Sequence, residues 1–142
     1  MGARMATASP GVGMNIRDIA ASDLEAVHRL LSSNGWAHRV CDLQQCSRLI
    51  SASQRAVVAV KGGQVVGFAR AITDGISNGY LSMVVVDEPN RRQGVGQALV
   101  ENLVGTEPNM TWVLRAGREG APEFFARLGF VASTTAMERC RA

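Results

Sequence analysis

A short stretch of the chain places two adjacent arginines directly before two glycines. It reads Arg91-Arg92-Gln93-Gly94-Val95-Gly96. Guanidinium groups carry a fixed charge and match phosphate oxygens in geometry. Glycines let an anion come close to backbone N–H groups, which have no partner in the first turn of a helix. The stretch is therefore a candidate cradle for a phosphate or pyrophosphate, although the same residues could form a plain strand–turn–helix connection.

Two common phosphate-binding loops do not fit this stretch. A Walker loop needs Gly-Lys-Ser/Thr, and Lys61 is the only lysine of the chain. The dinucleotide fingerprint Gly-x-Gly-x-x-Gly fails because residue 99 is leucine. The stretch is therefore neither a Walker loop nor a dinucleotide fingerprint.

The neighbouring elements would present the stretch at a helix start. Residues 83–86 form an uninterrupted apolar run, typical of a strand covered on both faces. Pro89 and Asn90 mark a turn. From Val95 the apolar residues recur at helical spacing. A buried strand thus leads through a short loop into a helix, whose dipole favours an anion at that end.

The remaining pattern predicts one domain over residues 14–142, after a disordered tail of residues 1–13. Ser22 is the expected N-cap of the first helix, with Glu25 completing a capping box. Strands are predicted at residues 14–19, 55–61, 64–73, 80–87, 110–115 and 130–138. Helices are predicted at residues 22–34, 36–53, 95–104 and 121–128.

Composition excludes several classes of protein. The 142 residues are 46% hydrophobic, enough for one core, and no apolar run approaches the ~20 residues of a membrane span. A net charge of +3 with 5% aromatic residues argues against nucleic-acid binding. Residues 1–13 lack the apolar segment of a secretory signal.

Cysteine usage favours a reduced, cytoplasmic protein without disulfides or metal. Cys41, Cys46 and Cys140 are an odd number and lack metal-ligand spacing. Cys41 or Cys46 could act as a nucleophile with His38 nearby, but buried or bystander thiols are commoner.

Residues 91–96 resemble motif A of the GNAT superfamily of acyl-CoA-dependent N-acyltransferases, Arg/Gln-x-x-Gly-x-Gly/Ala after a hydrophobic strand. Residues 124–130, Phe-Phe-Ala-Arg-Leu-Gly-Phe, are similar to the Phe-Tyr-x-x-x-Gly-Phe signature of the same family. The element order β-α-α-β-β-β-α-β-α-β is the GNAT order across residues 14–140. The resemblance implies an α+β fold of three layers, α/β/α, with a mixed, mostly antiparallel central sheet.

The resemblance also implies an activity. The chain would be an acyltransferase that moves an acetyl group from acetyl-CoA, a cosubstrate, to an amine by direct attack in a ternary complex, without a metal. The thioester would lie where the central strand and the next strand splay apart. The implied coenzyme-binding residues are Val84, Val85 and Val86 through their backbone, then Arg91, Arg92, Gln93, Gly94, Val95, Gly96 and Gln97 at the pyrophosphate, with Arg118 and Phe125.

Three positions depart from the family pattern. Phe125 stands where many relatives have a tyrosine that protonates the leaving thiolate, so another group, water or unassisted departure must serve. Ser82 falls where relatives often carry a glutamate base, and Arg118 where many carry asparagine. Tyr80, the only tyrosine, lies two residues before Ser82 on the same strand face. Tyr80 and Ser82 are the candidate catalytic residues, and a packed or substrate-lining Tyr80 is the alternative.

The acceptor is the least specified part of the sequence. Trp36, His38 and Asp74 are candidates to line its site, and the expected acceptor is an amine-bearing small molecule. Two alternatives stay open: a module that binds acetyl-CoA with little or no turnover, as a sensor or partner domain, and acetylation of a protein or aminoacyl-tRNA amine. A homodimer is possible, and no membrane partner is expected.

Overall fold

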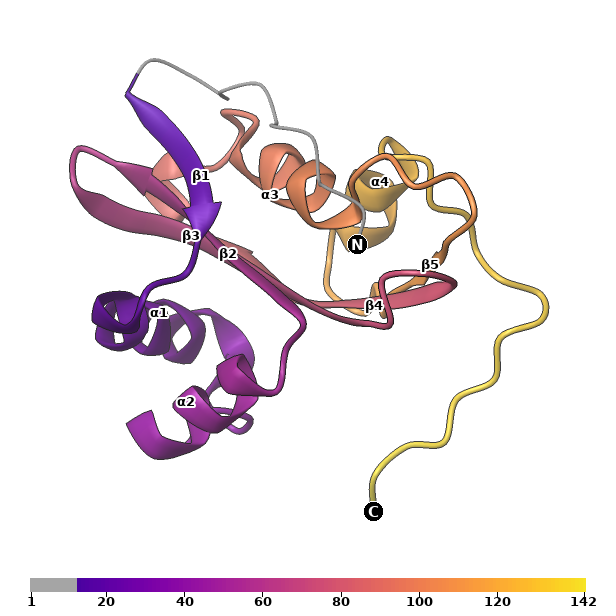
Figure 1. Cartoon of the computed structure of the whole chain (residues 1–142), viewed down its shortest axis with the longest axis horizontal. Helices are drawn as coiled ribbons and strands as arrows, with labels where there is room; N and C mark the ends of the chain where they lie inside the picture. The colour runs from indigo at the N-terminus through magenta and orange to yellow at the C-terminus, as the bar shows by residue number, and fades with distance from the viewer. Residues whose placement is uncertain (1–12) are drawn as a thin grey trace.

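One five-stranded sheet organises the structure, a computed structural model that describes residues 13–142 (Figure 1). Its strands, in spatial order, are β1 (Met14–Asp18), β2 (Arg55–Lys61), β3 (Gln64–Thr73), β4 (Asn78–Val86) and β5 (Thr111–Val113). The first four pair antiparallel, and β5 pairs parallel to β4. The predicted mixed, mostly antiparallel sheet is therefore confirmed. Of the predicted tail, only Gly13 lies inside the described residues.

Helices cover both faces of this sheet and complete the three predicted layers. On one face lie α1 (Leu24–Leu31) and α2 (Leu43–Ser51), and on the other α3 (Val95–Val104) and α4 (Ala121–Ala126). Each face has its own apolar cluster, and the fully buried Phe68 of β3 faces α1 and α2. Gly67 faces α3 so closely that a Cβ would lie 3.0 Å from Leu99 Cδ1.

The predicted start of the first helix is wrong. A 3₁₀ turn, Ala21–Asp23, precedes α1, and neither Ser22 nor Glu25 closes a capping box. The buried carboxylate of Asp23 instead accepts the Ala20 N–H at 2.7 Å and two hydrogen bonds from Arg17 at 2.7 and 3.0 Å. A paired carboxylate offers two strong acceptors, so it satisfies this helix end better than a hydroxyl.

The second helix begins later than predicted. Residues 32–36 form one wide turn in which Asn34 and Gly35 leave helical geometry, Gly35 with φ +93°. The α2 helix then begins at Leu43, where the Asp42 side chain accepts the Gln45 N–H at 2.7 Å. Residues 36–42 are thus a connection between two helices.

The predicted last strand, residues 130–138, does not form. Strand β5, the last strand of the described residues, is three residues long instead of the predicted six. Val131 is 89% exposed and Met137 98% exposed, whereas Phe130, at the start of the segment, packs against the core cluster and lies edge-on to the Phe125 ring. An ion pair between Arg115 and Glu138 at 2.6 Å ties the segment to the chain. A β-rich composition does not make a strand where no neighbouring strand is available to pair.

Candidate active site

The candidate site forms where β4 and β5 separate. The two strands pair only from Asn78 to Tyr80, with Thr111 to Val113. They meet tightly there, because a Cβ on Gly79 would lie 2.3 Å from the Trp112 ring. Beyond Tyr80, no strand of the described residues lies on that edge of β4. The splay expected for a thioester site is present.

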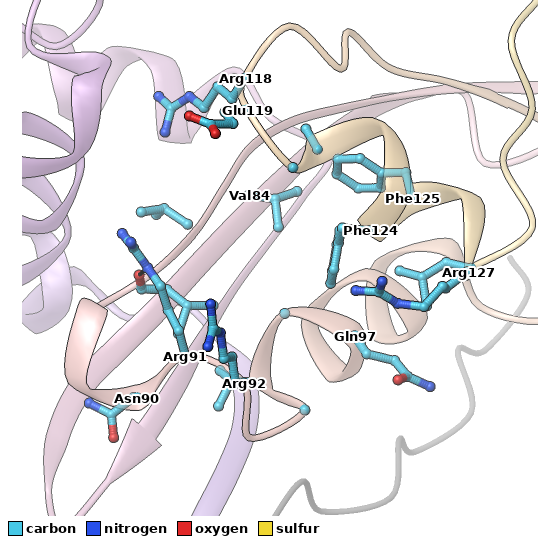
Figure 2. A pocket seen from close by; sticks show the side chains of 18 residues that line it. Val84, Asn90, Arg91, Arg92, Gln97, Arg118, Glu119, Phe124, Phe125 and Arg127 are labelled. Carbon is cyan, nitrogen blue, oxygen red and sulfur yellow. Dashed lines mark hydrogen bonds between the residues drawn. The ribbon is translucent and has the colours of Figure 1, made fainter.

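A cavity of about 540 Å³ occupies this position (Figure 2). Its lining comes from the end of β4, from the loop and first turn of α3, and from residues 118–128 around α4. The volume falls in the usual range of small-molecule sites, ~300–1,000 Å³. One end of the cavity carries charge and the other is apolar, which suits a ligand with the same division.

The charged end contains an uncapped helix start. Gly94 is the N-cap of α3, with φ +80°, and offers no side-chain acceptor. The first helical bond runs from the Ala98 N–H to the Gly94 carbonyl at 3.0 Å, so the N–H groups of residues 95–97 have no intrahelical acceptor. Val95, Gly96 and Gln97 line the cavity. Three free donors at a positive helix end fit a phosphate group.

The two glycines of the motif have different structural roles. Gly94 is needed for its left-handed backbone, which any other residue adopts at a cost. Gly96 is needed for packing, because a Cβ would lie 3.0 Å from Phe124 Cζ. The sequence suggested that Gly96 lets an anion come close to the backbone. In the structure, Gly96 also allows α4 to pack closely on α3.

Arginines dominate the polar lining of the cavity. Arg91, Arg92, Arg118 and Arg127 line it, against a single carboxylate, Glu119 (Figure 2). This imbalance creates a positive potential that attracts polyanions. Arg92 is exposed and adopts φ +62°, which is unusual for a residue other than glycine.

Arg91 and Arg118 also hold the connection between α1 and α2. Arg91 Nε donates to the Val86 carbonyl at 2.8 Å, and its Nη2 donates to Asn34 Oδ1 at 2.6 Å. Arg118 stacks on the Trp36 ring with its Cζ 4.3 Å from the ring centroid. Burial, with the nearby charge of Arg91, lowers the pKa of Arg118. The turn at residues 32–36, in the layer of α1 and α2, therefore contacts two arginines of the cavity rim.

The apolar end is built by β4 and α4. Val84 and Val86 pack against the same apolar cluster as Phe124 and Phe125. The Phe125 ring lies edge-on to Phe124 at 4.9 Å. A phenyl ring at position 125 gives the cavity an apolar wall and no acidic proton.

Strand β4 contains a bulge beside the cavity. Phe68 pairs with Val85 and Arg70 with Ser82, so two residues of β4, Met83 and Val84, lie opposite one residue of β3. Met83 adopts φ +57°, which costs a residue with a side chain about 1–2 kcal/mol. Bulges next to active sites redirect backbone groups out of the ladder. The bulge thus leaves backbone groups of β4 outside the regular β3–β4 hydrogen-bond pattern, at the point where β4 and β5 separate.

The two candidate catalytic residues lie on the other face of the sheet. Leu81 packs in the cluster under α3, so Tyr80 and Ser82 face the layer of α1 and α2. Both are half-buried, and neither lines the cavity. Tyr80 pairs with Ile72 and Ser82 with Arg70.

The three acceptor candidates lie in different surroundings. Trp36 contacts the cavity rim through Arg118, as described above, whereas His38 is exposed and does not line the cavity. The Asp74 carboxylate accepts N–H bonds from Ile76 and Ser77, both at 2.8 Å, within its own loop. The Ser77 hydroxyl is the main cause of an Asp74 pKa well below the usual range. This carboxylate is committed to the loop.

Two other predicted residues also lie away from the cavity. Gln93 Nε2 donates to the Pro89 carbonyl at 3.3 Å, and Gln93 is not a lining residue. Cys46 is fully buried, and burial raises the pKa of its thiol, which argues against a nucleophile there.

Some cavity residues were not singled out from the sequence. Phe124, Arg127 and Leu128 lie inside the signature at residues 124–130 and could have been found from it. Glu119 and Gly120 precede α4 and carry no local signal. Within residues 13–142, no helix is long and apolar enough to cross a membrane, and no three His, Cys, Asp or Glu side chains gather as a metal site would require.

Comparison with known proteins agrees with this architecture. The family model described as an acetyltransferase (GNAT) domain matches residues 52–132. A solved structure from Xanthomonas campestris pv. campestris, assigned to the GNAT family, is 26% identical with a TM-score of 0.76, covering 90% of this chain and 93% of that one. A search of curated protein sequences gives no significant match.

Two more distant structures share the fold. A GNAT-family acetyltransferase from Streptococcus pneumoniae is 23% identical with a TM-score of 0.68, over 90% of this chain and 96% of that one. A ribosomal-protein-alanine N-acetyltransferase from Brucella melitensis is 17% identical with a TM-score of 0.73, over 91% and 99%. The predicted fold class is thereby confirmed.

Proposed function

Since the chain belongs to the GNAT acetyltransferases and is therefore an acyltransferase, we propose that it transfers the acetyl group of acetyl-CoA to the amine of a small molecule by direct attack in a ternary complex. The family generally uses acetyl-CoA as its donor. The observation that carries the proposal is the cavity beside the free edge of β4. One end of the cavity has the uncapped, arginine-flanked start of α3, and the other end has an apolar wall. Acetyl-CoA has its pyrophosphate and its acyl thioester in the same order.

We assign the donor contacts as follows. The N–H groups of residues 95–97 and the Arg92 guanidinium would bind the pyrophosphate. The backbone of residues 84–86, on the unpaired edge of β4, would hydrogen-bond the pantetheine arm. Each charge-assisted hydrogen bond is worth roughly 1.5–3 kcal/mol. Phe125 would exclude water from the sulfur.

The chemistry makes few demands on side chains. The neutral amine nitrogen attacks the thioester carbon, the carbon–sulfur bond breaks, and the nitrogen releases one proton. Acetyl-CoA supplies an activated acyl group whose thiolate leaves readily. The bulged backbone at Met83 and Val84 is the nearest source of an N–H for the charge that develops on the carbonyl oxygen. Tyr80 and Ser82 would hold the amine or its leaving proton through water from the opposite face.

Two departures from the family pattern favour a second candidate, a module that binds acetyl-CoA with little turnover. Phe125 has no proton to donate, and Ser82 is too weak a base to replace a glutamate. Both roles can be filled by water, so we rank this candidate second. Acetylation of a protein or aminoacyl-tRNA amine ranks third.

The test combines calorimetry for acetyl-CoA with a thiol-release assay. Wild type and Phe125→Tyr are run in parallel on arylalkylamines, polyamines, amino acids and short peptides. Turnover by wild type would establish the enzyme and show that no acid is required at position 125. Tight acetyl-CoA binding without turnover on any acceptor would favour the binding module. A rate gain of tenfold or more in Phe125→Tyr alone would show that the proton is missing in wild type. Absence of acetyl-CoA binding would refute the cradle at residues 91–96.

A further inference from the structure

The most unusual charged residue of the described chain is Arg70, in the middle of β3. It is 8% exposed, and its neighbours along the strand, Ala69 and Ala71, are fully buried. Its Nη1 donates to Ser53 Oγ at 3.2 Å, and its Nε, also buried, has no hydrogen-bond partner in the described residues. A buried guanidinium normally has its donors satisfied, so this side chain is incompletely paired.

No carboxylate among the described residues acts on the charge of Arg70. The ionisable groups that act on it are Tyr80 and a second arginine, Arg39. Burial is the main reason why the pKa of Arg70 is lowered, and the Arg39 charge lowers it further. The ion pairs of Arg17 with Asp23 and of Arg115 with Glu138 lie elsewhere in the structure. An uncompensated buried charge is strongly destabilising, and a like charge beside it adds to that cost.

Arg70 marks the point where the helical cover of its face ends. It lies on the same face as Phe68, which α1 and α2 bury completely. Two residues further on the same face, Ile72 is 46% exposed. Ile72 pairs with Tyr80, and Tyr80 pairs with Val113, which is 42% exposed. In Figure 1, α1 and α2 lie under one half of the sheet, while β4 and β5 extend beyond them.

This open face reaches the edge of β4 beside the proposed donor cavity. Arg70 pairs across the ladder with Ser82, the residue directly before the bulge at Met83. The cavity residue Val84 lies two positions after Ser82 along the strand, a rise of roughly 7 Å. A small molecule that contacts Arg70 could therefore present an amine to the free edge of β4.

We propose that Arg70 binds a carboxylate of the acceptor, so that the substrates are amino acids and not simple amines. The inference rests on the proposed function, because it assigns the acceptor class of that same site. A carboxylate would supply the acceptor and the negative charge that the Arg70 guanidinium lacks among the described residues. Ser53 fixes one guanidinium nitrogen, so the planar group is held ready for the two oxygens.

The experiment compares acceptors that differ only in the carboxylate. Initial rates at saturating acetyl-CoA are measured for phenylalanine against phenethylamine, lysine against cadaverine, and β-alanine against ethylamine. We expect wild type to favour at least one carboxylate-bearing partner by about 10- to 100-fold in kcat/KM, the range of a charge-assisted pair. Phosphoethanolamine is included as the phosphate analogue.

Arg70→Met is the decisive variant, because an apolar residue of similar length can replace a buried charge without loss of stability. It should lose the preference, keep its kcat/KM for the amine without a carboxylate, and keep its affinity for acetyl-CoA. Arg70→Lys should retain part of the preference. Arg29→Met, on the exposed face of α1, is the matched control and should behave as wild type.

A binding measurement separates this inference from the proposed function. Phenylalanine and phenethylamine are titrated calorimetrically into wild type and Arg70→Met saturated with CoA. Binding that needs the carboxylate and disappears in Arg70→Met supports the inference even if no acceptor turns over, a result that would count against the proposed function alone. The inference is overturned by equal rates and affinities for both members of every pair, by preference for phosphoethanolamine, or by equal losses for both members in Arg70→Met.

Discussion

Arg92 combines an unfavourable backbone with a favourable charge, and the two can be separated by substitution. Its φ of +62° lies in the left-handed region, directly before the loop reaches Gly94. Its side chain lines the charged end of the cavity (Figure 2). Strained residues persist where the strain serves a site. We therefore predict that Arg92→Gly stabilises the free protein and weakens acetyl-CoA binding.

The size of each effect follows from the geometry. Glycine removes a left-handed penalty of about 1–2 kcal/mol, and its greater freedom in the unfolded chain takes back about 0.4–1 kcal/mol. The net gain is about 0.5–1 kcal/mol, or roughly 2–5 °C in Tm for a domain of this size. Loss of one charge-assisted phosphate contact costs roughly 1.5–3 kcal/mol, which weakens the affinity by about 10- to 150-fold.

Thermal denaturation without ligand and calorimetry with acetyl-CoA give the two numbers. Arg92→Lys is the matched control, because it keeps the charge and the strained backbone. It should melt like wild type and lose much less affinity, and the difference between the two variants should shrink as salt is added. If Arg92→Gly melts below Arg92→Lys, the backbone argument is refuted. If it binds acetyl-CoA as tightly as wild type, Arg92 is not part of a pyrophosphate site.

Two further predictions concern elements that hold the site in place. In Gly79→Ala the new Cβ would lie 2.3 Å from the Trp112 ring, so the ring must move and the β4–β5 pairing weakens, at a cost of about 1–3 kcal/mol in the free energy of unfolding. Gly117→Ala, which has open space around it, should leave stability unchanged. Equal Tm values for the two alanine variants would contradict this packing argument. The hydrogen bonds from Arg17 hold the pKa of Asp23 below its usual range, so the stability it contributes is present above about pH 4 and is lost as pH falls through the folded-state pKa. Asp23→Asn should therefore be less stable than wild type at pH 7 in urea titrations, and the gap should close toward pH 2; a gap independent of pH would exclude the charge as its cause.

Local sequence patterns predicted most of the fold, because the apolar periodicity of most helices and strands is visible within the element itself. The change from an apolar run at residues 83–86 to helical spacing after Val95 located β4, the loop and α3 correctly. The strand predicted at residues 130–138 failed for the opposite reason. A strand needs a partner, and β5 pairs over only three residues. The amino-acid composition of residues 130–138 does not show how long the neighbouring strand is.

The site was predictable where one motif contains it and not where distant segments meet. Residues 91–96 were predicted to form a cradle from their types alone, and all of them except Gln93 line the cavity. The contact between Arg118 and Trp36 joins residues far apart in sequence and depends on the packing of α1 and α4 regions around the cavity rim. Arg70 is a charged residue inside an apolar strand, which the sequence alone shows. That its Nε lacks a hydrogen-bond partner in the described part of the chain is visible only once β3 and β4 are aligned.

The sheet explains how two substrates could reach one another. The proposed donor cavity opens toward α3 and α4, whereas Arg70, Tyr80 and Ser82 face α1 and α2. A continuous sheet would keep ligands on its two faces apart. Here β5 leaves β4 after Tyr80, so the two faces meet along the free edge of β4, and the bulge at Met83 inserts an extra residue at that place. An amine held by its carboxylate on one face therefore has a path to a thioester held on the other, and the length of that path limits which amino acids can react.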